Sequence, residues 1–434
     1  MYQVPFDKGA MTFELPSGWH GTVAESRTSP PIEDVPAAVA EAVKNPIGSP
    51  PLRELAGPGD TACIVFTDIT RASPDYLLVP PVLAELEAAG VRDEDITLLC
   101  GIGMHRPSTH EEKIVKLGQA VVDRYRVIDN EPQNSEALVD LGTTESGIPL
   151  SVNKVAYEAD LLIATGIVEP HQYAGYSGGR KTLAVGAAGE AMIAYTHGPD
   201  MVDHPDTRLG QIESNPFHEA ITEAARRAGL QFIINVVQDD QKRVVCVRAG
   251  EPEAAFAQLV EMAKAIYEVP VPQQYDVAVA GVGFPKDANL YQASRAASYL
   301  FFAPVPVVKP GGVFIVPAPC GEGAGDGVGE QRFLKAMQQA PDVQAILDDA
   351  RQHGYPPGQQ RAFVMAKVLE QNDVIIVGAE DQDLIRSAKF LSEPTMDDAL
   401  RAVNQKLGND LDVLIVPHAL LTLPIVQRGA QGQL

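Results

Sequence analysis

Short runs of apolar residues recur along the chain, separated by longer stretches in which apolar residues come at spacings of three and four. The runs of the first half lie at 62–67, 96–100, 160–164 and 232–237. Between them, residues 75–89 and 216–228 carry the helical spacing. Unbroken apolar strands joined by helices are typical of a sheet that is covered on both faces. We therefore predict an α/β fold.

This alternation is interrupted by a proline-rich polar stretch at 269–274, which follows a helix-like segment at 253–267. Further apolar runs then follow at 276–280, 312–316, 373–377 and 412–416. A chain of 434 residues is long enough for two or three domains. We predict two α/β domains, residues 1–268 and 269–434, with an active-site cleft between them.

The charge balance is strongly acidic, with 57 Asp and Glu against 34 Lys and Arg and a formal net charge of -23. Such a charge repels nucleic acid and anionic lipid, so neither is expected as a partner. A small anionic substrate would then have to be bound by local cations. The sequence shows neither a signal peptide at its start nor an apolar stretch of 18 residues, and we expect a cytoplasmic protein.

The four cysteines show no CxxC spacing, and Cys63 and Cys100 lie within or at the end of apolar runs. We expect buried structural thiols rather than a metal or redox site.

Polar residues follow directly after the first apolar run, where open α/β sheets place ligand-binding groups. Asp68 and Arg71 lie in this segment, ahead of the helix expected at 75–89, and could hold an anion or a sugar hydroxyl. Ser73 could also cap that helix, with Pro74 in its first turn. Both interpretations are compatible.

A glycine-containing loop, GIGMHRP at 101–107, follows the second run and carries His105 and Arg106. Arg106 stands where the third glycine of GxGxxG would be, so the nicotinamide nucleotide fingerprint fails.

The longest motif, EPHQYAGYSGGRKT at 169–182, nearly matches the phosphate loop GxxxxGK[ST]. Gly175, Lys181 and Thr182 are in place, but Arg180 replaces the second glycine. A phosphoryl-transfer site therefore stays an alternative, and so many small residues beside two cations suit some phosphate or nucleotide.

In the second half, Gln292 and Arg295 are three residues apart and would share a helical face, where an amide and a guanidinium can meet one carboxylate. Surface residues without a role would look the same. His197, His204 and His218 lack the HxxxH spacing of a helical zinc site, so spacing alone supports a metal only weakly.

Taken together, these motifs resemble the nickel-dependent lactate racemase family, from Asp68 to beyond Arg295. The resemblance implies a nickel pincer nucleotide, a pyridinium bisthiocarboxylic acid mononucleotide whose nickel also binds one histidine. It implies racemisation or epimerisation of a small 2-hydroxy acid by reversible hydride transfer, through a 2-keto acid. It also implies that cofactor-synthesis proteins are partners.

The same resemblance assigns roles to single residues. Lys181 resembles the lysine that holds the cofactor covalently, His197 the nickel ligand, and His105 and His171 the two acid/base histidines, work that suits a near-neutral pKa. The residues on the cofactor side are Asp68, Arg71, Ser177, Gly178 and Gly179. Those on the substrate side are Arg71, Gln292 and Arg295. Lactate racemase itself has lysine where Arg295 stands, which leaves the identity of the hydroxy acid open, and a non-catalytic homologue that binds a hydroxy acid or nucleotide is a further alternative.

Overall fold

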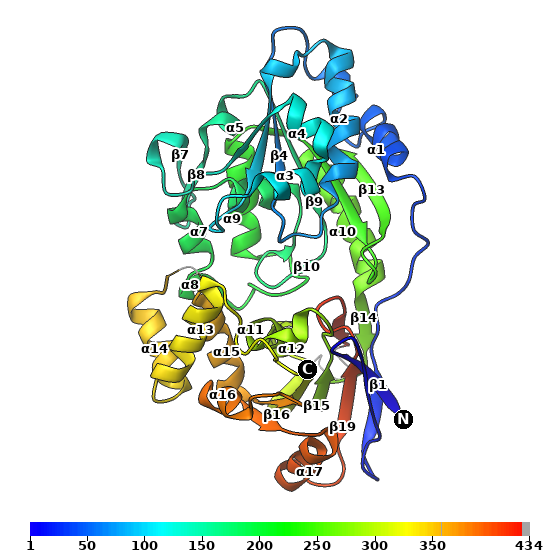
Figure 1. The fold of residues 1–434 in the computed structure, drawn as a ribbon, viewed down its shortest axis with the longest axis vertical. Helices are drawn as coiled ribbons and strands as arrows, with labels where there is room; N and C mark the ends of the chain where they lie inside the picture. Colours follow the sequence, from blue (N-terminus) through cyan, green and yellow to red (C-terminus); the bar gives the residue numbers. More distant parts are fainter. Residues whose placement is uncertain (357, 428–434) are drawn as a thin grey trace, which may run out of the picture. The chain divides into compact units, whose positions relative to one another are not determined.

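The computed structural model describes residues 1–356 and 358–427 and divides the chain into two compact units (Figure 1). The first unit comprises Thr28–His197 and Ile212–Ile266. The second unit comprises Met1–Arg27, Gly198–Gln211 and Tyr267–Leu434. Each unit contains one six-stranded sheet with helices around it, so the predicted α/β class is confirmed.

The sheet of the first unit has the order β13-β12-β9-β4-β5-β6. Its strands are β4 (Ala62–Thr67), β5 (Ile96–Gly101), β6 (Arg126–Asp129), β9 (Leu161–Ile167), β12 (Leu230–Gln238) and β13 (Val244–Gly250). All neighbours are parallel except β13, which runs antiparallel to β12. Every residue of β4 and β9 is buried, as expected for strands covered on both faces.

The order of these strands determines where a ligand site can form. From β4 the chain adds β5 and β6 on one side, then crosses to β9 and β12 on the other side. In open parallel sheets, ligands bind outside the carboxyl ends of the strands at such a reversal. The segments that follow β4, β5 and β9 therefore converge at one edge of the sheet.

Two helices, α1 (Val35–Lys44) and α2 (Asp75–Ala89), contribute buried side chains to the same core as one face of this sheet. Helix α2 begins without a side-chain cap: Pro74 occupies the cap position, and the Ser73 hydroxyl donates to the Asp75 carboxylate at 3.1 Å. The predicted cap by Ser73 is wrong, because the hydroxyl is engaged with this carboxylate instead of a backbone N–H. The remaining helices that matter for the site are α3 (His110–Leu117), α6 (Gly179–Lys181), α7 (Glu190–Thr196), α9 (Pro216–Arg227) and α10 (Pro252–Tyr267).

The sheet of the second unit is parallel throughout, in the order β18-β17-β16-β15-β19-β3. Its strands are β3 (His20–Val23), β15 (Tyr275–Ala280), β16 (Val308–Pro317), β17 (Asp373–Val377), β18 (Leu391–Glu393) and β19 (Asp412–Val416). Side chains from the central strands form a core with Trp19 and Leu400.

This arrangement differs from the domain limits predicted from the sequence. Residues 1–27 and 198–211 fold with the second unit, because β3 pairs with β19 and the Leu209 N–H donates to the Phe302 carbonyl at 2.9 Å. The proline-rich stretch at the predicted domain boundary overlaps β14 (Glu268–Val271), which pairs in parallel with β20 (Leu423–Val426). Prolines that alternate with valines are compatible with a strand that pairs along one edge.

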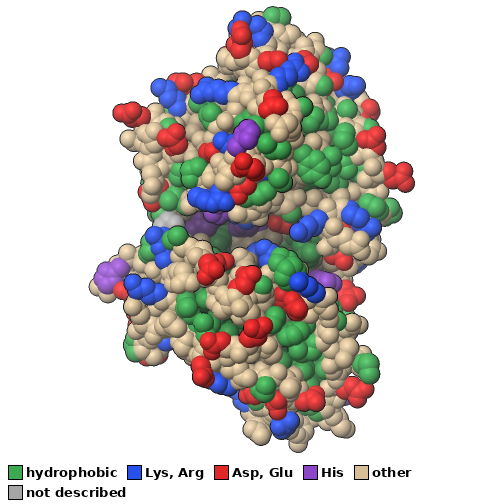
Figure 2. Space-filling model, in the orientation of Figure 1, with side chains coloured by type: hydrophobic (Ala, Val, Ile, Leu, Met, Phe, Trp, Pro, Cys, Tyr) green, Lys and Arg blue, Asp and Glu red, His purple; other side chains and the backbone are tan. Residues whose placement is uncertain are grey.

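Charged side chains of both signs lie on the surface (Figure 2). Acidic and basic side chains are interspersed over the face drawn in Figure 2. Across residues 1–356 and 358–427, no helix combines the length and apolar character needed to cross a membrane. All four cysteines are buried and unpaired with one another, as predicted.

Candidate functional site

Asp68 and His105 meet at the carboxyl edge of the first sheet, where β4 and β5 end. The Asp68 Oδ2 atom lies 2.5 Å from His105 Nδ1, and Oδ1 accepts the Thr70 hydroxyl at 2.8 Å. Burial acts to raise the pKa of Asp68, but the His105 contact, the Thr70 hydroxyl and the charge of Arg71 outweigh it and lower that pKa. An ionised Asp68 fixes the proton of His105 on Nδ1, which leaves Nε2 as the basic nitrogen.

A cavity of about 80 Å³ opens beside this pair. Its lining residues are Asp68, Ile69, Thr70, His105, Arg106, Ser108 and Glu112. Within it, both terminal nitrogens of Arg106 bind the Glu112 carboxylate, at 2.8 and 2.6 Å. The positive charge of Arg106 is thereby compensated inside the chain.

His171 lies in a short hairpin after β9, formed by β10 (Pro170–His171) and β11 (Gly175–Tyr176). Its Nδ1 accepts the backbone N–H groups of Tyr173 and Ala174, each at 3.2 Å. A nitrogen that accepts two N–H groups carries no proton, so the neutral ring has its proton on Nε2. His171 therefore differs from His105, whose Nε2 is the acceptor.

His197 follows α7 directly, and its ring is partly buried. Its Nδ1 lies 3.0 Å from the Ile193 carbonyl oxygen, which can only accept, so Nδ1 carries the proton and Nε2 the lone pair. Burial, followed by the charge of Lys181, lowers the pKa of His197 to about 3. A neutral ring with Nδ1 held by a carbonyl is the form in which histidine binds metals.

Lys181 ends α6, and its side chain is partly buried. Burial, followed by the positive charge of Arg71, lowers its pKa to about 7, against the opposing charges of Glu169 and Asp68. At neutral pH a large fraction of the amine is uncharged, which makes it a nucleophile rather than a fixed cation.

The glycines before Lys181 let α6 pack closely against the sheet. A Cβ atom on Gly178 would lie 3.0 Å from Asn235 Nδ2 and from the Phe256 ring, and Gly178 has a φ of 151°. A Cβ on Gly179 would lie 2.9 Å from Ile233 Cγ2. These contacts give both glycines a packing role in addition to the cofactor contact implied by the resemblance.

Ser177 and Arg180 complete the segment. The Ser177 hydroxyl donates to the Ile167 carbonyl at 2.7 Å and accepts the Glu169 N–H at 3.1 Å, which closes the loop after β9. The buried Arg180 guanidinium donates to the Thr222 hydroxyl at 2.7 Å and lies 4.0 Å above the Phe256 ring. Arg180 therefore anchors α6 rather than binding a phosphate in the loop.

Two aromatic side chains, Tyr173 and Phe217, pack against the rings of His171 and His197. The ring of Phe217 lies 5.3 Å from that of His197 and 6.2 Å from that of His171. Tyr173 contacts the same rings, at 5.4 Å from His197 and 5.8 Å from His171. Tyr173 and Phe217 were not predicted; the only available signal was the position of Tyr173 inside the long motif.

In the second unit, the predicted pair of Gln292 and Arg295 is in contact. Gln292 lies in α11 (Leu290–Ala293) and Arg295 begins α12 (Arg295–Phe301). Arg295 Nη1 donates to Gln292 Oε1 at 3.1 Å, and Nη2 donates to the Tyr299 hydroxyl at 2.7 Å. The structure thus brings the pair together, through two short helices instead of one.

Among the described residues, no group of three or more His, Cys, Asp or Glu side chains gathers as a metal site. A larger groove of about 610 Å³ lies among α13 (Val328–Gln339), α14 (Val343–His353) and α15 (Gln360–Gln371). None of the predicted site residues lines it.

Comparison with known proteins decides the family. Residues 6–210 match the family described as the lactate racemase N-terminal domain, and residues 272–423 match the lactate racemase C-terminal domain. The chain belongs to the lactate racemase family. The lactate racemase of Thermoanaerobacterium thermosaccharolyticum is 31% identical over 425 residues, covering 96% of this chain and 97% of that protein. The lactate racemase of Lactiplantibacillus plantarum is 32% identical over 434 residues, covering 96% and 98%.

Two solved structures agree with the fold. The lactate racemase apoprotein from Thermoanaerobacterium thermosaccharolyticum superposes with a TM-score of 0.86 at 30% identity and covers 98% of this chain and 99% of that chain. A Thermotoga maritima protein, 19% identical with a TM-score of 0.66, covers 92% of this chain and 100% of its own; at that identity it supports the fold alone. The family resemblance read from the sequence is confirmed.

Proposed function

We propose that this lactate racemase family member racemises or epimerises a small 2-hydroxy acid with a nickel pincer nucleotide as cofactor. The observation that carries the proposal is a lysine of lowered pKa whose charge acts on a histidine held in the tautomer that binds metals. Lys181 has a pKa of about 7, and His197 has a pKa of about 3 with its lone pair on Nε2.

Both residues fit the cofactor. An uncharged Lys181 amine can bond to a carboxyl-derived arm of the nucleotide, which a protonated amine cannot. His197 would supply a single nitrogen ligand, which suits a metal whose other ligands come with the nucleotide. When bound, that group would accept the hydride from C2 of the substrate and return it.

His105 and His171 would handle the hydroxyl proton. His105, held by the Asp68 carboxylate, offers Nε2 as an acceptor, so it would take the hydroxyl proton of one enantiomer. His171, held by two backbone amides, offers an Nε2–H donor to an oxygen on the other side. Inversion through a planar keto acid requires, at its start, an unprotonated base on one side of the substrate and a proton donor on the other.

The residues that the resemblance assigns to the substrate side are Arg71 in the first unit and, in the second unit, the contacting pair of Gln292 and Arg295. Guanidinium groups bind a carboxylate through two parallel hydrogen bonds, whereas lysine acts as a point charge. Because Arg295 replaces the lysine expected for lactate racemase itself, we propose a hydroxy acid other than lactate, such as malate or a larger one.

Phosphoryl transfer gains no support from the geometry. Arg180 is turned onto Phe256 and Thr222, and the Thr182 hydroxyl donates to the Gly178 carbonyl at 3.4 Å. Both groups are thus engaged by the chain in the loop that would have to hold phosphate and magnesium.

The test is expression together with cofactor-synthesis proteins, followed by intact mass, nickel analysis and chiral separation of products from lactate, malate and larger hydroxy acids. We expect a mass increment, bound nickel and racemisation of at least one acid. Lys181→Ala, made the same way, is the matched control and should carry no increment. A loaded protein that inverts none of the acids would refute the proposed function, and would leave the non-catalytic homologue.

A further inference from the structure

A buried ion pair lies beneath the loop that carries Asp68 and Arg71. Lys116, near the end of α3, places its Nζ atom 2.8 Å from Oδ2 of Asp75, the first residue of α2. Their side chains are 6% and 0% exposed. Neither residue lines the cavity beside His105.

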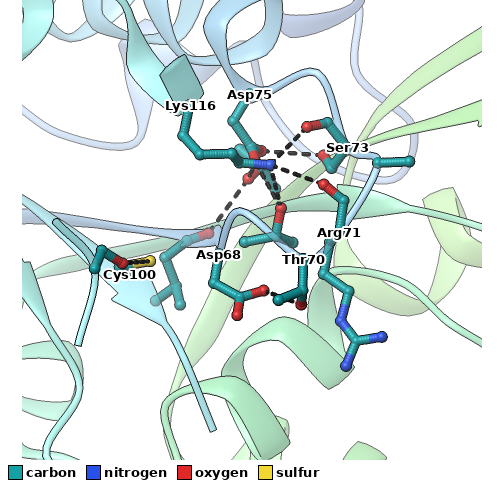
Figure 3. A network of polar contacts seen from close by, with 12 residues as sticks. Asp68, Thr70, Arg71, Ser73, Asp75, Cys100 and Lys116 are labelled. Atoms are coloured by element: carbon teal, nitrogen blue, oxygen red, sulfur yellow. Dashed lines mark hydrogen bonds and ion pairs between the residues drawn. The ribbon is translucent and has the colours of Figure 1, made fainter. Parts of the chain in front are cut away.

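The ammonium group binds the loop itself. Lys116 Nζ donates to the Ser73 carbonyl at 2.7 Å and lies 3.3 Å from the Arg71 carbonyl oxygen. Figure 3 shows the Arg71 carbonyl turned toward Lys116, whereas the Arg71 guanidinium points away from it. One cation therefore holds two backbone carbonyls of the segment between β4 and α2.

The Asp75 carboxylate joins this cation to the sheet. It accepts the hydroxyl of Thr67 at 2.6 Å, at the end of β4, and that of Thr165 at 2.6 Å, in β9. The Thr67 hydroxyl in turn accepts from Lys116 at 2.9 Å. The network thus connects both strands of the topological reversal with the loop.

Burial of a charged pair is by itself weak evidence of a gain in folding free energy. Two charges taken out of water lose hydration, and apolar residues of similar volume would stabilise a core at least as well. An apolar pair could not, however, satisfy the carbonyls of Arg71 and Ser73. The ammonium has three donors, which it shares among the two carbonyls, the Asp75 carboxylate and the Thr67 hydroxyl.

We propose that the Lys116–Asp75 pair positions the loop after β4, so that Asp68 stays on Nδ1 of His105 and Arg71 keeps its place beside the Lys181 segment. Both are positioning residues, since they act through Asp68 and Arg71. The catalytic consequence of this role rests on the proposed function, whereas its structural consequence can be measured without any cofactor.

The experiment removes both charges at once with Lys116→Met combined with Asp75→Asn, so that no buried charge is left alone. The matched control is Arg53→Met combined with Glu85→Gln. Glu85 lies on α2, and Arg53, in the short helix at Leu52–Glu54, places its Nε atom 2.6 Å from the Glu85 carboxylate, whose side chain is 7% exposed. Among the described residues, neither side chain is hydrogen-bonded or ion-paired to the loop after β4.

Two readouts on the cofactor-free chain report the position of the loop. The first is the downfield proton resonance of His105 Nδ1–H, assigned by its absence in His105→Ala. The second is amide hydrogen exchange of residues 68–73. We expect the Lys116/Asp75 variant to lose the resonance and to exchange these amides at least about tenfold faster, while the Arg53/Glu85 variant keeps both.

In loaded protein, kcat of the Lys116/Asp75 variant should fall about ten- to a hundredfold, with a smaller change in KM, because displaced catalytic groups lower the rate more than binding. A folded Lys116/Asp75 variant with wild-type resonance and exchange would overturn the positioning role. If that variant does not fold, Lys116→Arg gives the same comparison, because it keeps a cation beside Asp75 but changes its reach to the carbonyls. A wild-type chain that is loaded yet inactive would refute the proposed function and leave the two cofactor-free readouts valid.

Discussion

The ring of Tyr173 packs edge-on against the ring of His197, with centroids 5.4 Å apart and planes at 82°. This contact and the Ile193 carbonyl fix the direction of His197 Nε2. We expect Tyr173→Leu to weaken nickel retention in loaded protein by about ten- to a hundredfold, as is usual when groups that orient a metal ligand are lost. Competition with a chelator measures this, and Tyr195→Leu, an exposed tyrosine on the same helix as Thr196, is the control. Equal retention in both variants would show that His197 needs no such support.

Substitutions of Lys181 and of His197 should remove two different properties of the loaded protein. Lys181→Ala removes the only proposed covalent link, so the mass increment should disappear, whereas His197→Ala should keep the increment and lose nickel. Intact mass and elemental analysis of the same samples separate the two effects. An unchanged increment and nickel content in both variants would contradict the assignment.

The lowered pKa of Lys181 predicts an unusual pH profile. Because the folded-state pKa is about 7 instead of 10.5, the amine is protonated and unreactive below that pH and becomes nucleophilic above it. In the cofactor-free chain, labelling of Lys181 by an amine reagent should rise to half its maximum near pH 7, whereas a lysine side chain in a short unstructured peptide, labelled in parallel, needs a much higher pH. Arg71→Ala removes a positive charge and should move the Lys181 midpoint upward. A Lys181 midpoint equal to that of the peptide would refute the lowered pKa.

The different hydrogen bonds of His105 and His171 predict unequal defects. His105→Ala and His171→Ala should each lower racemisation by about a hundredfold to ten-thousandfold, while the absorbance of the bound cofactor is kept. Rapid mixing with each enantiomer should reveal one-sided spectral changes, because each variant retains the group for one direction. Near-normal turnover in both directions, in either variant, would rule out a two-histidine mechanism.

Arg295 should determine which acids are used. Its guanidinium is held by Gln292 and Tyr299, so Arg295→Lys changes both reach and hydrogen-bond geometry. We expect relative rates across lactate, malate and larger hydroxy acids to change, and Tyr299→Phe to change them less. Identical profiles for Arg295→Lys and the wild type would place Arg295 outside the substrate site.

The buried strands could be predicted from the sequence, because unbroken apolar runs have few alternatives. The predicted limits of β4, β17 and β19 agree with the structure at both ends. The short exposed strand β3 has no such run, and only its partner β19, far along the chain, makes it a strand. Long-range pairing of this kind leaves no local pattern.

For the site, the sequence predicted the candidate residues but not the packing and hydrogen bonds that position them. Asp68 and His105 were each predicted to follow a strand, and their contact depends on the pairing of those two strands in the sheet, which the sequence did not predict. The ring contacts of Tyr173 and Phe217, and the burial of Lys116 with Asp75, depend on packing between segments that spacing does not reveal. A lysine on an amphipathic helix is usually exposed, so nothing local marked Lys116.

The pairing of β3 with β19 has a consequence for synthesis on the ribosome. The first unit is built from residues 28–197 and 212–266, so all of it has been translated before residues 267 and onward of the second unit. Strand β3 precedes the first unit in the chain, yet the strand that it binds, β19, follows that unit. Domains generally fold as units in the order in which they emerge. Strand β3 therefore has no partner strand until β19 has been translated. A protease added during translation should still cleave the segment that contains β3 after the first unit has become resistant.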